Sequence, residues 1–467
     1  MFKQRNHFTL ISVLILLTFA SCKKEGKDLM VAPPSSPTTT NPGAPATSSA
    51  LQFNQVAFQK SQDYYLWNTQ LPATLNFGSY TDPVGVMTAI RQYSTEAGFS
   101  APVDRWSFAM KKTEWDQLSG GLGSLFSSTS TEGDFGITVF FRAENDLRVR
   151  LVEPNSPGGA AGIHRGWRIT KINGNTDITT ANATFIIDNI YKSTTASVTF
   201  VKPDGTSVDI SLNAAHYQKK SVYMDTVYNT ISGKAGYLVY NSFLGNIGAS
   251  AAEYSRVFSK FAAAGITDLI VDLRYNGGGY VDLQSQLANY IINNSANGGL
   301  MMKQIYNSNH AAENSTTFFN KSGSVNLSKV YFIVSRSTAS ASELLINNLK
   351  PYMDVRLIGS ANTHGKPVGY FPIENGEWYV FPVSFKTVNK NNEGNYYAGF
   401  APNAVIADGL DKDWGDVTES SLASALKNIS TGNFSSGTQN IYAEPDDVVR
   451  GNTALDATML RITIGKR

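Results

Sequence analysis

The stretch that decides the fold covers residues 330–345 and reads VYFIVSRSTASASELL. Its first five residues form an apolar run typical of a buried strand, and an apolar helical pattern starts at Leu344 and Leu345. A strand that enters a small-residue turn and then a helix presents the hydroxyl of Ser340 at the start of that helix. A serine at its free pKa is a poor nucleophile and needs an adjacent base to react.

A lysine suited to that task is Lys366, which follows a second short apolar run at residues 355–359. A loop after this run can bring the amine to the Ser340 hydroxyl. Lysine acts as a base only if its pKa falls, which burial and an absence of nearby carboxylates would cause. No acidic residue flanks Lys366 within residues 365–369. The pair predicts a Ser-Lys hydrolase, and the residues alone leave open a helix-capping serine and a solvated loop lysine.

The residues around this pair resemble the C-terminal-processing (tail-specific) serine peptidases. Three stretches match in order: residues 272–279 (DLRYNGGG), residues 339–343 (ASASE) and Gly365-Lys366. The resemblance extends from about residue 51 to about residue 430. It implies a core with the spiral αβ fold shared by Clp-type peptidases and crotonases, with Ser340, rather than Ser342, as nucleophile and Lys366 as general base.

The third catalytic position departs from this family. Many members place a glutamine four residues after the lysine, where this chain has Tyr370. The resemblance therefore leaves two alternatives, a dyad that acts alone or a dyad assisted by Glu343 or Gln284. His364 stands where the family usually has an aromatic residue, and we interpret it as structural.

An oxyanion hole requires backbone N–H groups aimed at the developing negative charge. The glycine run at residues 277–279 follows a buried strand and is suited to this role. We predict Gly278 and Ala341 as the two donors, and we expect Asp272 and Arg274 to hold the turn. The alternative interpretation of the glycines is a plain tight turn.

Residues 130–212 resemble a PDZ domain. Phe135, Gly136 and Ile137 correspond to the carboxylate-binding loop and the strand after it, and residues 154–169 to the central helix and its following turn. Such a domain binds an extended C-terminus by adding it to a sheet edge. We therefore expect protein or peptide partners with free C-termini, with a structural lid as the alternative.

The N-terminus has the features of a bacterial lipoprotein signal. A basic start and an apolar run at residues 8–20 precede Cys22, the only cysteine. Residues 1–22 are predicted to be the signal peptide and Cys22 the acylated residue, which predicts a lipid-anchored protein of the cell envelope. The alternative is an ordinary signal peptide with a chance cysteine. Residues 23–50 are polar and proline-rich and predict a flexible linker.

The remaining chain divides into three parts by pattern. Residues 51–125 predict a helical domain, in which we assign residues 104–108 (DRWSF) a structural role. Residues 220–430 alternate strands and helices and predict the peptidase core, while residues 431–467 form a C-terminal extension to which the sequence assigns no role. The predicted class is multidomain α/β: a small helical region, a β-rich PDZ-like domain and an αβ core.

Composition excludes other function classes. A net charge of +2 gives no reason to expect nucleic acid, and no zinc motif, phosphate loop or dinucleotide fingerprint is present, so we expect no metal or other cofactor. Two competing functions stay open. One is a catalytically inactive PDZ-bearing, peptide-binding lipoprotein on a protease scaffold, and the other is a non-peptidase hydrolase or hydratase on a crotonase-like core.

Overall fold

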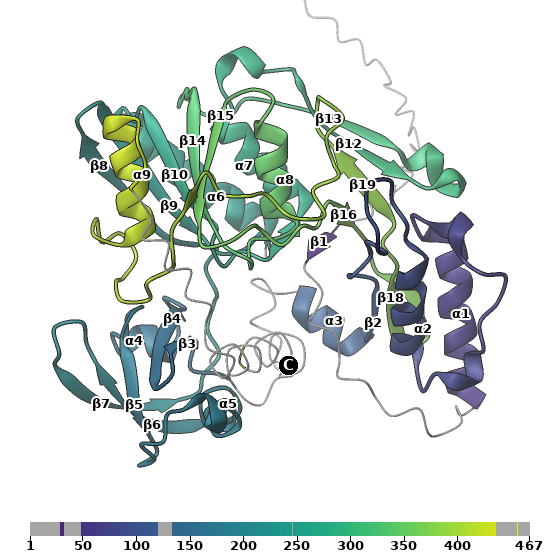
Figure 1. The fold of residues 1–467 in the computed structure, drawn as a ribbon, viewed down its shortest axis with the longest axis horizontal. Helices are drawn as coiled ribbons and strands as arrows, with labels where there is room; N and C mark the ends of the chain where they lie inside the picture. Colours follow the sequence, from purple (N-terminus) through teal and green to yellow (C-terminus); the bar gives the residue numbers. More distant parts are fainter. Residues whose placement is uncertain (1–28, 32–47, 120–132, 245, 436–454, 456–467) are drawn as a thin grey trace, which may run out of the picture.

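The centre of the molecule is a six-stranded sheet (Figure 1). The computed structural model describes residues 29–31, 48–119, 133–244, 246–435 and 455. The sheet order is β20-β15-β14-β10-β9-β8, and only the β8–β9 pair is antiparallel. The predicted αβ core is confirmed. The strands are β8 Val222–Thr230, β9 Gly233–Tyr240, β10 Asp268–Asp272, β14 Lys329–Val334, β15 Asp354–Gly359 and β20 Ala404–Val405.

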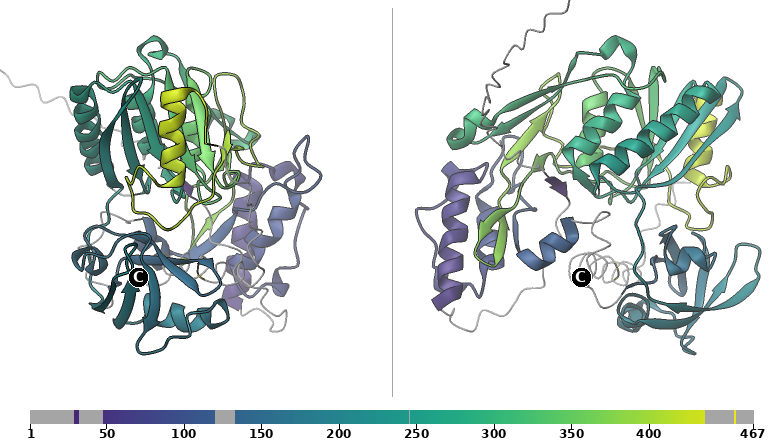
Figure 2. Two further views of the ribbon diagram at one scale, coloured as in Figure 1. Left: turned by 60° about the vertical axis from the view of Figure 1, so that its left-hand side comes forward. Right: turned by 180° about the vertical axis from the view of Figure 1, so that it is seen from behind.

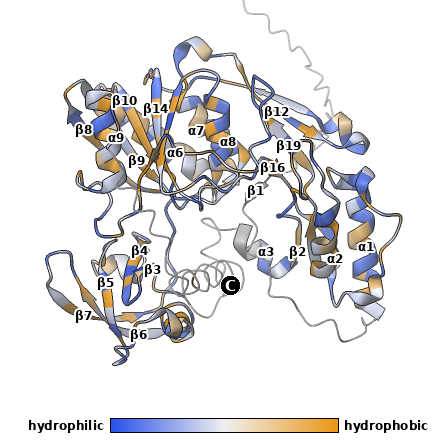
Figure 3. Ribbon diagram, viewed as in Figure 1, coloured by the Kyte–Doolittle hydropathy of each residue, from blue (hydrophilic) through white to orange (hydrophobic). Residues whose placement is uncertain are grey.

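Helices cover both faces of this sheet (Figures 1 and 2). Alternation along β10 explains the layers, because Leu269 and Val271 join the main core, whereas Ile270 packs with Ile429 on the other face. The orange strands of Figure 3 reflect this double burial. The first face carries α6 Ile247–Ala264, α7 Val281–Ile291 and α8 Ala341–Leu349, and the second carries α9 Ser420–Thr431.

The predicted N-terminal helical region is present, and it contributes a strand to a sheet of the core. Its strand β2 (Phe108–Lys111) pairs with β18 of the core in a three-stranded sheet, and the rings of Phe108 and Phe381 stack 4.2 Å apart. The predicted helical domain at residues 51–125 therefore shares a sheet with the core. The remaining elements are α1 Ser48–Tyr64, α2 Pro83–Ile90, α3 Lys112–Ser119, β17 Ile373–Asn375 and β18 Trp378–Phe381.

A four-stranded sheet continues the core beside this region, in the order β13-β12-β19-β16. Its strand β16 lies directly after Lys366 and pairs with β19. The strands are β12 Leu300–Tyr306, β13 Ser315–Phe318, β16 Val368–Gly369 and β19 Phe385–Val388.

Residues 133–215 form a five-stranded antiparallel sheet with its own apolar core. The strand order follows the sequence, so β3 lies at one edge of the sheet. Val139 of β3 donates its N–H to the Tyr191 hydroxyl (2.9 Å) across this edge. The elements are β3 Ile137–Ala143, β4 Asp146–Val152, α4 Pro157–Ala160, β5 Arg168–Ile172, α5 Ala183–Ile187, β6 Thr195–Val201 and β7 Ser207–Asn213.

A short strand stands within the predicted linker at residues 23–50. β1 (Leu29–Val31) pairs antiparallel with β11 (Gly278–Tyr280), which directly follows the first glycine of the turn. One short strand thus stands within the predicted linker, and the linker itself stays a prediction. Cys22 and the rest of the predicted signal peptide lie outside the described residues. Within the described ranges no helix is long and apolar enough to cross a membrane.

Candidate active site

Ser340 lies between β14 and α8, at the position that the sequence predicts. Its backbone has φ 61° and ψ −116°, a conformation that costs a non-glycine residue about 1–3 kcal/mol. The side chain is fully buried, and in the part of the chain that the structure describes its Oγ has no hydrogen-bond partner. Ser340 is the N-cap of α8, and its N–H donates to Glu343 as in a capping box, but its strained backbone and its unbonded Oγ are not explained by capping alone.

Ser342 has a different environment from Ser340. Its hydroxyl donates to the carbonyl oxygen of Asn276 (3.0 Å), which also accepts from the Ala339 N–H (3.1 Å). These bonds attach the start of α8 to the turn before the glycines. The geometry therefore favours Ser340 over Ser342 as the reactive hydroxyl.

The carboxylate of Glu343 joins the two predicted catalytic residues. Its Oε2 accepts from the backbone N–H groups of both Ser340 (2.9 Å) and Lys366 (2.8 Å). Its Oε1 accepts from the Thr363 hydroxyl (2.5 Å) and the Gly365 N–H (2.6 Å). Burial raises the pKa of Glu343, although these four donors oppose the shift. One side chain thus ties the lysine loop to the start of α8.

Lys366 is fully buried. Burial lowers the pKa of its amine well below the ordinary value, while the carboxylates of Asp104 and Glu343 oppose this shift. The Nζ atom lies 3.9 Å from the centre of the Tyr370 ring. An aromatic face therefore contacts the amine from the position where many resembling peptidases have a glutamine. A lysine in this environment can carry an uncharged amine at moderate pH.

The other helper considered from the sequence, Gln284, lies on α7. Its Oε1 accepts a hydrogen bond from Asn348 of α8 (3.4 Å). It contacts a neighbouring helix, whereas Glu343 and Tyr370 contact the catalytic candidates directly. The sequence named Glu343 only as one of two alternatives and gave Tyr370 no role.

The glycine turn is held by Asn276, a residue to which the sequence pattern assigns no role. Its Oδ1 accepts from the Gly278 N–H (2.9 Å), and its Nδ2 donates to the Tyr240 carbonyl oxygen (3.0 Å). The predicted donor Gly278 is therefore engaged, while the N–H of Gly277 donates to no residue that the structure describes. Ala341 is the first residue of α8, where N–H groups have no acceptor within the helix.

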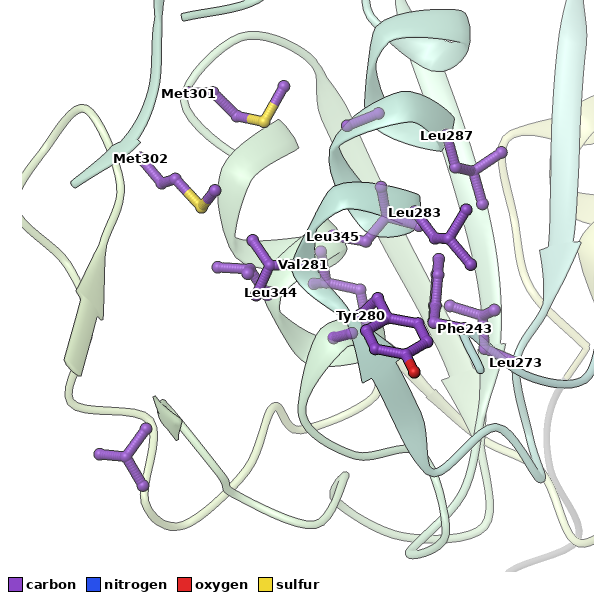
Figure 4. Close-up of a cluster of buried hydrophobic side chains, with 14 of the residues drawn as sticks. Phe243, Leu273, Tyr280, Val281, Leu283, Leu287, Met301, Met302, Leu344 and Leu345 are labelled. Atoms are coloured by element: carbon purple, nitrogen blue, oxygen red, sulfur yellow. The ribbon is translucent and has the colours of Figure 1, made fainter. Parts of the chain in front are cut away.

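Apolar side chains support this turn from behind. β11 lies over α7 and α8, and Figure 4 shows Phe243, Tyr280 and Leu283 packed together beneath it. Arg274, which precedes the turn, pairs with Asp272 (2.8 Å) and with Glu419 (2.9 Å), and the expectation that Asp272 and Arg274 hold the turn stays a prediction.

The segment DRWS of the N-terminal region contacts the lysine loop directly. The Trp106 Nε1–H donates to His364 Nε2 (3.1 Å), and the Arg105 guanidinium donates to the carbonyl oxygens of His364 (3.3 Å) and Tyr397 (3.1 Å). Burial lowers the pKa of His364 to about 4, so its ring is neutral and accepts from Trp106. The interpretation of His364 as structural agrees with these contacts.

Asp104 organises this segment from within. Its carboxylate accepts from the Tyr65 hydroxyl (2.8 Å), the Trp106 N–H (2.8 Å) and the Ser107 N–H and hydroxyl (3.1 and 2.6 Å). The only sequence signal for this contact with the lysine loop was the presence of an arginine, a tryptophan and an aspartate in one short loop. The partners of Arg105 and Trp106 in the lysine loop and at Tyr397 lie 258 to 292 positions away, beyond what spacing can indicate.

The predicted peptide-binding loop of the five-stranded domain lies apart from the serine in sequence and fold. Phe135 and Ile137 are buried in that domain's core. Gly136 has φ 67°, and a Cβ there would lie 2.0 Å from Ser156 Cβ, so only glycine fits. Its N–H donates to Asp134 Oδ1 (2.8 Å). Among the described residues, no group of three or more His, Cys, Asp and Glu side chains could hold a metal ion.

The fold and this site combine a mixed αβ core with a buried serine and a buried lysine. Residues 234–405 match the sequence profile described as Peptidase family S41. The chain therefore carries a domain of peptidase family S41. The fold also matches the crystal structure of a candidate S41 protease from Bacteroides fragilis NCTC 9343, with a TM-score of 0.65 and 22% identity over 84% of this chain and 98% of that one.

Curated relatives agree with the family. The "Probable CtpA-like serine protease" of Staphylococcus aureus (strain bovine RF122 / ET3-1) is 26% identical over 239 residues, which cover 50% of this chain and 45% of the relative. Its namesake in Staphylococcus epidermidis is 24% identical over 279 residues, or 57% of this chain and 50% of the relative. The chain thus spans about half the length of these relatives.

Proposed function

We propose that this protein is a serine endopeptidase in which Ser340 is the nucleophile and Lys366 its general base. The observation that supports this most is the shared oxygen of Glu343, which accepts from the N–H groups of both residues. The unbonded Oγ of Ser340 and the lowered pKa of Lys366 supply the two chemical properties that such a dyad needs.

In this reaction the uncharged Lys366 amine takes the hydroxyl proton of Ser340, and Oγ bonds to the carbonyl carbon of the scissile peptide. The oxyanion accepts hydrogen bonds from the Ala341 N–H and from the glycine turn. Gly277 is the better donor than the predicted Gly278, because the Gly278 N–H donates to Asn276. The Lys366 ammonium then protonates the leaving amine, and water, activated by the same lysine, hydrolyses the acyl-enzyme.

The test of the nucleophile is digestion of casein or a tagged peptide by Ser340→Ala. We expect a loss of about a thousandfold or more in kcat/KM, with the fold retained. Ser337→Ala is the matched control, since Ser337 is an exposed serine of the same turn. Full activity in folded Ser340→Ala would end the assignment, and an inactive Ser342→Ala beside an active Ser340→Ala would move the nucleophile by two residues.

The test of the base is the pair Lys366→Ala and Lys366→Arg. Both should be inactive. Lys366→Ala removes the base, and the guanidinium of Lys366→Arg does not give up its proton at accessible pH. The wild-type rate should rise with pH through an apparent pKa below about 10.4, the value of an ordinary lysine. Retained activity in Lys366→Ala would exclude this base.

We further propose that the five-stranded domain is a PDZ domain that selects substrates by their C-terminal tails. The edge position of β3, directly after Phe135 and Gly136, supports this, because a peptide can add to a sheet edge, where it would replace the hydrogen bond from the Val139 N–H to Tyr191. A tailed peptide with a free carboxylate should be cut faster than the same peptide amidated. Equal rates would leave the domain a structural role.

Anchoring through an acylated Cys22 remains part of the proposal, on the sequence alone. Cys22→Ser should move the protein from the membrane fraction to the soluble fraction, since loss of the lipid removes the anchor. Retention after a high-salt wash would contradict it. An inactive peptide-binding lipoprotein, the alternative that Tyr370 motivates, requires that wild type and Ser340→Ala be equally inactive.

A further inference from the structure

The strand β11, which contains two of the three glycines of the turn, has two edges with different partners. On one side of this strand the Phe243 N–H donates to the Gly278 carbonyl oxygen (2.9 Å) and the Tyr280 N–H donates to the Phe243 carbonyl oxygen (2.8 Å). Successive residues of a strand direct their backbone groups to opposite edges. The N–H and C=O of Gly279 therefore point to the other edge, away from Phe243.

That other edge is occupied by the chain itself. β1 pairs antiparallel with β11 in the register Leu29 to Tyr280, Met30 to Gly279 and Val31 to Gly278. It also lies beside β16, which begins two residues after Lys366 (Figures 1 and 2). The segment thus runs between the strand after the glycine turn and the strand after the lysine.

A peptide substrate would need this same place. Gly278 belongs both to the glycine turn and to β11, so an extended peptide paired with β11 has its backbone beside the proposed oxyanion donors. An unpaired strand edge is a template for any extended chain. The pairing therefore marks the class of ligand, which is an extended and unstructured segment bound antiparallel to β11.

We propose that residues Leu29–Val31 are an intramolecular competitor for the substrate edge of β11, an inference that rests on the proposed peptidase function. The segment is short, since Pro33 and Pro34 cannot continue a hydrogen-bonded ladder. A three-residue strand forms few backbone bonds, so an incoming peptide displaces it. Attachment to the enzyme gives it a local concentration in the millimolar range, which is enough to raise the apparent KM.

The test uses the full chain with Met30→Pro, because proline removes the N–H opposite Gly279 and disfavours the strand. The matched control is Thr39→Pro, which places the same residue elsewhere in the predicted linker. We expect KM for a fluorogenic peptide to fall by about twofold to tenfold in Met30→Pro with kcat unchanged, and to stay constant in the control.

A second measurement separates this inference from catalysis. In the Ser340→Ala background, a labelled synthetic peptide with the sequence of residues 25–34 should bind Met30→Pro more tightly than Thr39→Pro by fluorescence anisotropy. Amide hydrogen exchange at Gly279 should also be faster in Met30→Pro. If the peptide binds Met30→Pro more tightly but no Ser340-containing variant shows proteolysis, the proposed function is wrong and this inference stands. Active enzyme with equal KM, equal peptide binding and equal exchange at Gly279 would overturn the inference alone.

Discussion

The N-terminal region and the five-stranded domain both contact loops of the candidate active site, but they do so in different ways. The first contacts the lysine loop through Arg105 and Trp106, which bond to backbone and to a neutral histidine. The second inserts the buried Arg165, whose guanidinium pairs with Asp408 and donates to the Lys412 carbonyl oxygen. The first contact shapes the site itself, whereas the second attaches a domain to it.

The charges around Arg165 explain how the five-stranded domain can be held at one defined place on the core. Although burial opposes it, the guanidiniums of Arg165 and Arg274 hold the pKa of Asp408 well below its usual range. Tyr275, which precedes Asn276 and the glycine turn, donates its hydroxyl to the same carboxylate. The domain thus reaches the glycine-turn side of the site through Tyr275, while the N-terminal region reaches the lysine side.

The largest effect should come from breaking the first contact at Asp104. Asp104→Ala removes one acceptor from four buried donors, which we expect to lower stability by about 3 kcal/mol and kcat by about a hundredfold through displacement of the lysine loop. Thermal unfolding and peptide cleavage measure the two losses. Asp63→Asn, at an exposed carboxylate of α1, is the control.

Asp104→Asn distinguishes positioning from simple stability. The Asp104 carboxylate raises the pKa of Lys366 against the larger lowering by burial, so its neutralisation should lower that pKa further. The acid limb of the pH–rate profile should therefore move to lower pH. A loss of rate with an unmoved acid limb would give Asp104 a purely structural role.

A smaller effect is expected where the N-terminal region supports the lysine through aromatic rings. Phe108 of β2 packs edge-on against Tyr370 (5.2 Å), and Tyr370 presents its ring face to the Lys366 amine. Tyr370→Leu should lower kcat by about tenfold, because loss of the ring face leaves the amine less well oriented. Tyr370→Phe keeps the ring and should stay near wild type. If Tyr370→Phe falls as far as Tyr370→Leu, the hydroxyl is the active feature and the ring is not.

The contrast between local and distant contacts also explains what the sequence could predict. The run at residues 330–334, the small turn and the apolar start of α8 are contiguous, so the position of Ser340 follows from local pattern. Strand Asp268–Asp272 and the glycine turn were found in the same way. The pairing of β2 with β18 joins residues about 270 positions apart, and no local pattern encodes it. The engagement of Gly278 by Asn276 was missed for a different reason, because either glycine fits the same motif.

The smallest effect on the rate of peptide cleavage is expected for Arg165→Met, which should instead weaken the contact between the five-stranded domain and the core. Methionine keeps the bulk of the side chain but removes the charge, while Arg274 still pairs with Asp408 (3.2 Å). Removing one partner of a buried pair costs about 3–5 kcal/mol, and here this cost weakens the attachment of the domain and not the stability of the core.

We expect the five-stranded domain of Arg165→Met to unfold at a lower temperature, with faster limited proteolysis between it and the core. Short peptides without a recognised tail should be cut at the wild-type rate, and the preference for a free C-terminus should shrink. Arg168→Met, at a half-exposed arginine of the same domain, is the control. If Arg165→Met instead slows the cleavage of all peptides equally, the five-stranded domain supports the glycine turn through Tyr275. The contacts of the domain and of the N-terminal region would then both position the candidate active site.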